Sequence, residues 1–427
     1  LYLPDSNGEQ TKILFNRTYY AGVISKDNEK NELVKQEKTP NYDLLVSGDS
    51  AFFERITETD PDTKMEQALI VVKDGAELTL MSEKTHNESN PSKTVIRVEK
   101  DANASLTLDG VYIDVSDTGD SSTAGLSPLE VAKDSAGNIE VILKGTNVLK
   151  AGYFCAGLQK NGEEDSVGKL TISGEGELQI AGGYAGAGIG GGRWEGERNI
   201  TISGGTVAAT GGEYGAGIGG GSEGDGRDIT ISGGTVSAIG GKCAAGIGGG
   251  NQGDGVDITI SEGNVTATGG TGGGAGIGGG AITQKASNIT ISGGTVIATG
   301  QWGASGIGDG AAKFWDTLVT ITGGCVKANG ISNGAKGSDG QPVYPARIDL
   351  MMLSGRQAKV GPVAWYTCKE DGSENAQISY GSTDLYSLSD GYLYVFLPAN
   401  EEGTVTRADF GNTVYEGAIG AISAKET

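Results

Sequence analysis

Apolar and polar residues alternate along most of this chain in short segments separated by glycines. In the segment that begins at Ile200, Ile200 and Ile202 flank Thr201. After a Ser-Gly-Gly turn, Val207 and Ala209 continue the alternation, and a third short apolar segment follows a glycine-rich loop. An alternation of period two is typical of strands with one buried face. Three strands joined by three glycine-rich turns predict one triangular coil.

This pattern recurs at a nearly constant distance along the chain. The first residue of each copy falls at Leu170, Ile200, Ile229, Ile258, Ile289 and Val319. A fixed period of this length indicates a solenoid, and about thirty residues with three strands fit a coil better than a four-stranded propeller blade. We therefore predict an all-β, right-handed parallel β-helix of ~30-residue coils. In it, Ile202, Ile231, Ile260 and Ile291 should form one internal stack.

Degenerate copies and changes of pattern suggest the domain boundaries. The segments 78–80, 106–111 and 141–158 follow the repeat loosely and predict earlier coils, so the β-helix should span residues 66–332. Residues 1–65 are polar and poorly periodic, and we expect them to cap the first coil. After Ser332 a glycine-rich stretch reads as a linker, and residues 333–427 predict a small C-terminal antiparallel β domain.

Charge and composition exclude several classes of function. The net charge is −22 and basic residues do not cluster, which argues against nucleic-acid partners. No apolar run is long enough for membrane insertion, and we expect a monomer. Cys155, Cys243, Cys325 and Cys368 should be free thiols because neighbouring pairs lie about three coils or more apart. The single histidine, His86, predicts an exposed loop residue and cannot support a zinc site alone.

Carbohydrate chemistry is suggested by the third strand of the coils. Its outward positions are mostly glycine and predict a flat floor without side chains. Aromatic residues occupy both borders of this floor. The candidate glycan-binding residues are Tyr184, Trp194, Tyr214, Trp302 and Trp315, with Phe314 beside the last of them. Sugar rings stack on such aromatic faces. Alternatively, the aromatics only cover the backbone of the corners, and glycine only permits tight packing.

Acidic residues suggest two further kinds of site. Asp225 and Asp228 should stack on Asp254 and Asp257 of the next coil, and Ca²⁺ would relieve their repulsion. Solvent around loop acids would relieve it equally well. If the protein is an enzyme, Asp225 and Asp254 could form a glycosidase pair. Asp309, which replaces a repeated glycine near Trp302, is then the first catalytic candidate, or else reflects drift of a terminal repeat.

The strings T-I-S-G-G-T-V-x-A-T-G-G and G-A-G-I-G-G-G resemble repeats in cell-surface proteins of Gram-positive gut anaerobes. Among these are the clostridial β-helix carbohydrate-binding proteins. The tail D-G-Y-L-Y-V-F-L-P at residues 390–398 resembles a segment that often follows such repeats. The resemblance implies an extracellular protein at the cell wall or cell surface of a Gram-positive bacterium.

We therefore expect a secreted or wall-associated, adhesin-like protein that binds a polysaccharide or host glycan without catalysis. A glycoside hydrolase or polysaccharide lyase on the same scaffold is the first alternative, and a structural stalk is the second. No cofactor is expected other than the Ca²⁺ considered above.

Overall fold

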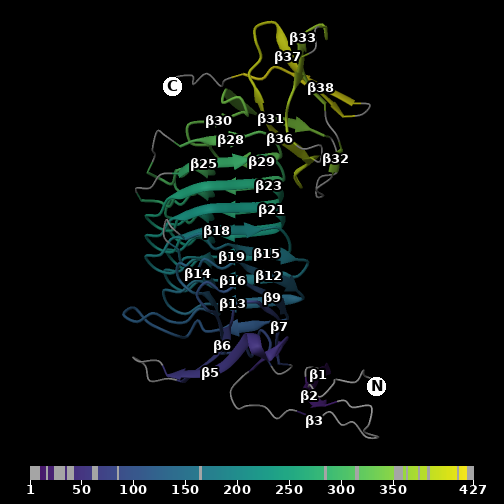
Figure 1. The fold of residues 1–427 in the computed structure, drawn as a ribbon. Coiled ribbons are helices and arrows are strands. Elements are labelled where there is room, and N and C mark those ends of the chain that lie inside the picture. Colours follow the sequence, from purple (N-terminus) through teal and green to yellow (C-terminus); the bar gives the residue numbers. More distant parts are fainter. Residues whose placement is uncertain are drawn as a thin grey trace.

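The chain folds as the all-β parallel β-helix that the repeat predicts (Figure 1). The computed structural model describes residues 43–59, 66–83, 86–162, 166–282, 286–312, 317–350, 359–361, 364–373, 376–381, 385–410 and 413–420. It also describes the backbone of an N-terminal antiparallel sheet of β1 (Gln10–Phe15), β2 (Thr18–Val23) and β3 (Val34–Lys35). In this described part no helix is long and apolar enough to cross a membrane.

Each coil has three strands that pair in parallel with the same strands of the next coil. The first strands are β7 (Ala76–Ser82), β9 (Ala104–Asp109), β12 (Ile139–Lys144), β15 (Leu170–Gly174), β18 (Glu197–Ile202), β25 (Ala286–Ile291) and β28 (Val319–Ile321). The second strands are β10 (Tyr112–Asp114), β13 (Thr146–Lys150), β16 (Glu177–Ala181), β19 (Thr206–Thr210), β26 (Thr295–Thr299) and β29 (Cys325–Ala328). In two central coils, single strands β21 (Gly226–Ile239) and β23 (Gly255–Thr268) run along both faces.

The third strands form a separate parallel sheet that shortens along the helix. They are β8 (Val95–Val98), β11 (Leu129–Val131), β14 (Leu158–Lys160), β17 (Ile189–Gly190), β20 (Ile218–Gly219), β22 (Ile247–Gly248), β24 (Ile277–Gly278) and β27 (Ile307–Gly308). Only two residues pair in each strand of the regular repeat, because the chain turns sharply on either side.

The core consists of stacks of like residues. Ile202 pairs with Ile231, which pairs with Ile260 and through it with Ile291, and all four are fully buried. The same stack continues downward through Ile172, Val141, Leu106 and Leu78. The predicted internal stack and the degenerate coils are therefore confirmed. Each buried aliphatic side chain stabilises the fold by roughly 1.5–3 kcal/mol.

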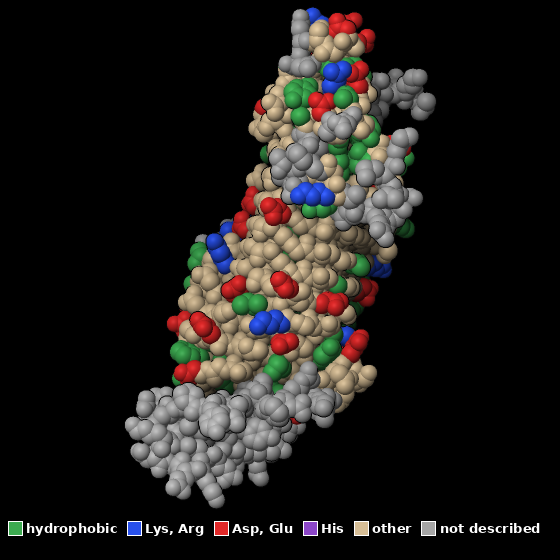
Figure 2. All heavy atoms as spheres, turned by 90° about the vertical axis from the view of Figure 1, so that its right-hand side faces the viewer, with side chains coloured by type: hydrophobic (Ala, Val, Ile, Leu, Met, Phe, Trp, Pro, Cys, Tyr) green, Lys and Arg blue, Asp and Glu red, His purple; other side chains and the backbone are tan. Residues whose placement is uncertain are grey.

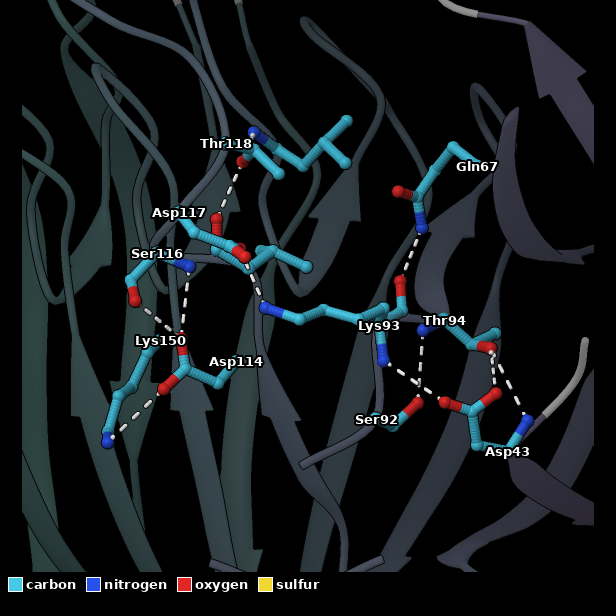
Figure 3. A network of polar contacts seen from close by, with 12 residues as sticks. Asp43, Gln67, Ser92, Lys93, Thr94, Asp114, Ser116, Asp117, Thr118 and Lys150 are labelled. Carbon is cyan, nitrogen blue, oxygen red and sulfur yellow. Dashed lines mark hydrogen bonds and ion pairs between the residues drawn. The ribbon is translucent and has the colours of Figure 1, made fainter. Parts of the chain in front are cut away.

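Antiparallel strands lie over the first coil. β4 (Leu44–Ser47) pairs with β7, the 3-10 helix η1 (Ser50–Phe52) follows, and β5 (Phe53–Thr59) pairs with β6 (Glu66–Val72). Asp43 anchors this segment: its carboxylate accepts hydrogen bonds from the Thr94 hydroxyl and the Lys93 amide, both at 3.2 Å (Figure 3). His86 Nε2 lies 3.4 Å from the same carboxylate. The expectation of an exposed loop histidine is therefore wrong, because His86 packs against this segment.

At the other end, part of the expected linker continues the helix. β30 (Ala335–Lys336) pairs in parallel with β28 and antiparallel with β31 (Pro342–Asp349), which pairs with β36 (Tyr392–Pro398). The remaining strands are β32 (Lys359–Gly361), β33 (Ala364–Lys369), β34 (Ala376–Ile378), β35 (Leu385–Tyr386), β37 (Thr404–Phe410) and β38 (Thr413–Gly417). The Tyr380 hydroxyl donates to the Gly324 carbonyl at 2.8 Å and so joins this C-terminal module to the last coil.

The surface carries few charges on the side that Figure 2 presents. Backbone and uncharged polar side chains cover most of this face, and the Lys and Arg side chains lie singly among acidic ones.

All four cysteines are free, as predicted. Burial raises the pKa of the Cys155 thiol to about 12 and that of Cys325 to about 11.

Two charged residues interrupt the apolar interior near the first coils of the regular repeat. Lys160 and Glu197 are 2% and 1% exposed. The Lys160 ammonium donates to the Arg198 carbonyl, whereas neither carboxylate oxygen of Glu197 has a hydrogen-bond partner among the described residues. Burial raises the pKa of Glu197 to about 8, and the nearby Lys160 charge opposes that rise. Glu197 occupies the register position that Gly226 and Gly255 hold in later coils.

The substitution Glu197→Gln should change how stability depends on pH. Because the folded-state pKa of Glu197 lies above its unfolded value, the folded protein binds the extra proton between about pH 5 and about pH 8. The free energy of unfolding of the wild type should therefore fall across this window, by on the order of a few kcal/mol from this group. Thermal unfolding of both proteins at several pH values measures the difference. A difference in Tm that stays constant from pH 5 to pH 8 would contradict this assignment.

Candidate functional site

The glycines of the third strand do not form an open floor. Gly217, Gly219, Gly246 and Gly248 are all buried. The loops on either side of the strand bond to each other between coils: the Asn251 amide donates to the Tyr214 carbonyl at 2.9 Å, with equivalent bonds in neighbouring coils. A Cβ atom on Gly219, whose φ is +135°, would lie 1.9 Å from the Gly248 carbonyl oxygen. The prediction of an open glycine floor is therefore wrong, and these glycines permit close stacking of the coils.

Aromatic side chains instead gather on the loops that close over this strand. We use "aromatic patch" for Tyr153, Phe154, Tyr184, Trp194 and Tyr214. The rings of Tyr153 and Tyr184 stack with centroids 4.8 Å apart and planes 7° from parallel. Tyr214 meets Tyr184 edge to face at 5.4 Å, and Phe154 meets Tyr153 in the same way at 4.6 Å. The patch thus spans three consecutive coils.

Arg193 connects the two sides of the patch. Its guanidinium carbon lies 4.3 Å from the ring centroid of Phe154 and 3.8 Å from that of Trp194. The Arg193 amide also donates to the Phe154 carbonyl at 2.8 Å. Trp194 Nε1 donates to Glu223 Oε1 at 3.3 Å, which fixes the indole against the next coil. The loop before β14 and the loop after β17 therefore present one continuous surface.

Backbone strain accompanies the aromatic side chains. Phe154 and Trp194 have φ values of +69° and +62°, a left-handed conformation that bulky residues rarely adopt. Glycine or asparagine would adopt it at lower cost. Trp194 is nevertheless 61% exposed, so burial of its ring does not account for its presence there. The same left-handed turn recurs at Glu223 and Gln252, one and two coils further on, with φ values of +62° and +63°, so the coil requires this backbone conformation and its loop displays the Trp194 ring.

Tyrosine hydroxyls supply polar groups at the edge of the patch. Hydrogen bonding to Tyr184, and then to Glu213, raises the pKa of Tyr214 to about 12. Exposed rings with polar tips are suited to ligands that have both apolar faces and hydroxyl groups.

The remaining aromatic candidates do not join this patch. Trp302 lies on the loop before β27, is 82% exposed, and lines a pocket of about 590 Å³ with Asn329 and Ser332. This pocket is at the C-terminal end of the third face. Trp315 and Phe314 lie outside the described residues.

The stacked acids are held by arginines. Arg227 Nη2 lies 2.7 Å from Asp225 Oδ2, and the other oxygen of Asp225 accepts the Asp254 amide at 2.7 Å. Arg198 Nε lies 3.2 Å from Asp228 Oδ2. Across the described ranges, no group of three or more His, Cys, Asp or Glu side chains could hold a metal ion. The predicted Ca²⁺ cluster is therefore not assembled: arginines pair with Asp225, Asp228 and Asp254, and Asn288 donates to Asp257.

Backbone conformation explains why Asp and Asn recur at one of these positions. Asn199, Asp228, Asp257 and Asn288 all have φ between +52° and +63°. Asn and Asp tolerate this left-handed region better than other side chains. Asp257 Oδ1 also accepts from Asn288 Nδ2 at 2.8 Å. The recurrence that suggested a metal site is thus a requirement of the turn before the first strand.

Asp309 is directed inward and performs a structural role. It is 1% exposed, and its carboxylate accepts hydrogen bonds from the Thr317 hydroxyl and the Ala286 amide. The Ser332 hydroxyl accepts its backbone N–H at 2.8 Å. The prediction that the Asp309 side chain projects from the edge of an open floor is therefore wrong. Asp225 is likewise engaged by Arg227 and the Asp254 amide, and Asp254 Oδ2 lies 3.9 Å from the same guanidinium. Asp309 lines the pocket beside Trp302, but its carboxylate is bonded to Thr317 and Ala286.

Sequence reasoning missed Tyr153, Phe154 and Arg193. Leu158 pairs with Ile189, so Tyr153 holds the same register position in a degenerate coil that Tyr184 holds in a regular one. Extending the register into degenerate coils would have found Tyr153. No signal in the sequence indicated that the Arg193 side chain contacts the rings of both Phe154 and Trp194.

Comparison with known families supports the architecture. Residues 170–193, 200–222, 229–251, 258–281 and 289–311 match a family model described as beta helix repeat. These segments correspond to the five coils in which the third strand has only two paired residues. No curated protein and no solved structure matches the chain.

Calcium should have no effect on stability if arginines neutralise the stacked acids. EDTA and added Ca²⁺ should both leave the Tm of the wild type unchanged. Arg227→Gln should lower the free energy of unfolding by about 1 kcal/mol, the upper range for a partly exposed ion pair. Thermal unfolding with and without Ca²⁺ measures both effects. A rise in the Tm of the wild type with Ca²⁺, reversed by EDTA, would restore the metal site.

Proposed function

We propose that this β-helix repeat protein binds carbohydrate chains through the aromatic patch, and that it acts at a cell surface without catalysis. The observation that carries the proposal is the contiguity of five aromatic rings from three coils, on loops from both sides of the third strand. Aromatic groups of this size on a soluble protein typically mark an interaction site.

The chemistry of the patch favours sugars over purely apolar ligands. Tyr and Trp rings offer flat faces to the C–H faces of sugar rings, and their polar tips can bind hydroxyls. Tyr184 is 37% exposed and Trp194 is 61% exposed, so part of each ring remains accessible to a ligand. Successive coils are about 4.8 Å apart, which aligns the rings along the helix axis. An extended polymer lying along that axis could contact several of them.

Features outside the patch agree with an extracellular setting. The thiols of Cys155 and Cys325 are buried and have raised pKa values, which makes them poorly reactive toward oxidants. The net charge of −22 favours solubility. The repeat motifs resemble those of Gram-positive cell-surface proteins, whose partners would be polysaccharides or host glycans. We propose that the protein acts there as a monomer.

Binding is favoured over hydrolysis because the candidate carboxylates are engaged elsewhere. Asp309 is buried against Thr317, and Asp225 is paired with Arg227. The aromatic patch, in contrast, has no packing role that accounts for its exposed rings. Release of products from a bound glycan would support an enzyme instead, and failure to bind any glycan would support a stalk.

Trp194→Ala and Tyr184→Ala should each weaken binding to a glycan that the wild type retains on an array. Loss of one stacking aromatic costs about 1–3 kcal/mol in comparable ring-stacking sites. Trp302→Ala is the matched control, because Trp302 is also exposed at positive φ but lies outside the patch. Isothermal titration of the three variants gives the affinities. The proposal fails if both patch variants bind as tightly as the wild type.

A further inference from the structure

We propose that Arg193 makes the aromatic patch selective for acidic sugars by pairing with a ligand carboxylate, as in a uronic acid. This inference rests on the proposed function and specifies the ligand class of the same site. Its basis is the position of the guanidinium, which contacts two aromatic rings.

The ring contacts leave the N–H groups of the Arg193 guanidinium available for hydrogen bonding. The guanidinium carbon is 4.3 Å from the Phe154 ring centroid and 3.8 Å from that of Trp194. The N–H groups of arginine lie in the guanidinium plane and form a rigid fork. Contact with the two rings engages none of these N–H groups in a hydrogen bond, so they remain for a ligand. A carboxylate matches the fork through two parallel hydrogen bonds.

Arg193 also lacks the partner that other arginines of this protein have. Arg198, Arg227 and Arg407 each form an ion pair with a carboxylate, at distances from 2.7 to 3.2 Å. Within the part of the chain that the structure describes, the Arg193 side chain makes ring contacts but no hydrogen bond or ion pair. Arg347, which lies 4.4 Å from the Tyr392 ring centroid in the C-terminal module, shares this arrangement, but only Arg193 belongs to the aromatic patch.

Neighbouring carboxylates restrict where an acidic group can bind. Glu223 accepts the Trp194 indole N–H, and Glu213 is hydrogen-bonded to Tyr214. Both occupy the border of the patch, where they would repel a ligand carboxylate placed anywhere except on Arg193. The overall charge of −22 repels acidic polymers at long range, but salt at about 0.15 M screens this beyond about 8 Å. Selectivity would therefore arise from the short-range contact.

The test uses an array of uronate oligosaccharides, each beside its carboxyl-reduced, neutral counterpart, at about 0.15 M salt. The wild type should bind at least one acidic member about tenfold or more tightly than its reduced counterpart, the factor expected for a charged hydrogen-bonded pair. Arg193→Gln should abolish this ratio. Arg193→Lys keeps the charge but loses the fork, and should retain only part of it. Arg347→Gln, which removes an arginine stacked 4.4 Å from Tyr392 in the C-terminal module, should leave the ratio unchanged.

The ratio of the two affinities separates selectivity from general damage to the patch. If Arg193→Gln only loosens the rings, both ligands weaken equally and the ratio persists, which overturns the inference. Equal binding of acidic and neutral members by the wild type overturns it as well. In either case, loss of glycan binding by the Trp194→Ala variant would still support the proposed function. If no member binds, acidic or neutral, the proposed function itself fails.

Discussion

In-register parallel pairing of successive coils is the constraint on which the rest of the structure depends. Because each strand pairs residue for residue with its counterpart, a side chain lies over the same position of the next coil. Ile202 and Ile231 thereby form part of a continuous apolar stack. The same register brings the Gly219 backbone so close to Gly248 that no side chain fits between them. It also places Tyr153 against Tyr184, so the patch follows from the rule that builds the core.

Departures from the repeat concentrate where the degenerate coils meet the regular ones. Lys160 and Glu197 are buried there, and the next two coils have glycine at the register position of Glu197. The aromatic patch occupies the outer side of the same region, around Arg193. Higher coils have glycine-rich loops with few large side chains. Fully regular coils optimise stacking and leave little room for recognition, so irregular coils are where specific chemistry can be accommodated.

The periodicity predicted the coil and its internal stacks, because those depend only on which positions are apolar and how far apart they are. It could not predict the path of the loops beside the third strand. For that reason the alternation predicts an exposed glycine floor at Gly217 and Gly219, whereas the loops bury both glycines. Asp228 and Asp257 were interpreted as metal ligands, whereas the left-handed backbone selects them. Tyr184, Trp194 and Tyr214 were predicted as ligand-binding residues, but their grouping around Arg193 depends on side-chain contacts between coils.

Register between coils brings the aromatic residues of separate loops together, and we propose that they bind a glycan as one surface. Hydroxyl-radical footprinting of the intact protein, with and without a glycan that it binds, tests this. The glycan should protect Tyr153, Tyr184 and Trp194 together, although they belong to different loops. Oxidation of Trp302, which is more exposed than Trp194 but lies outside the patch, should not change. Protection of Trp302 or of the C-terminal module, with the patch still oxidised, would contradict the account.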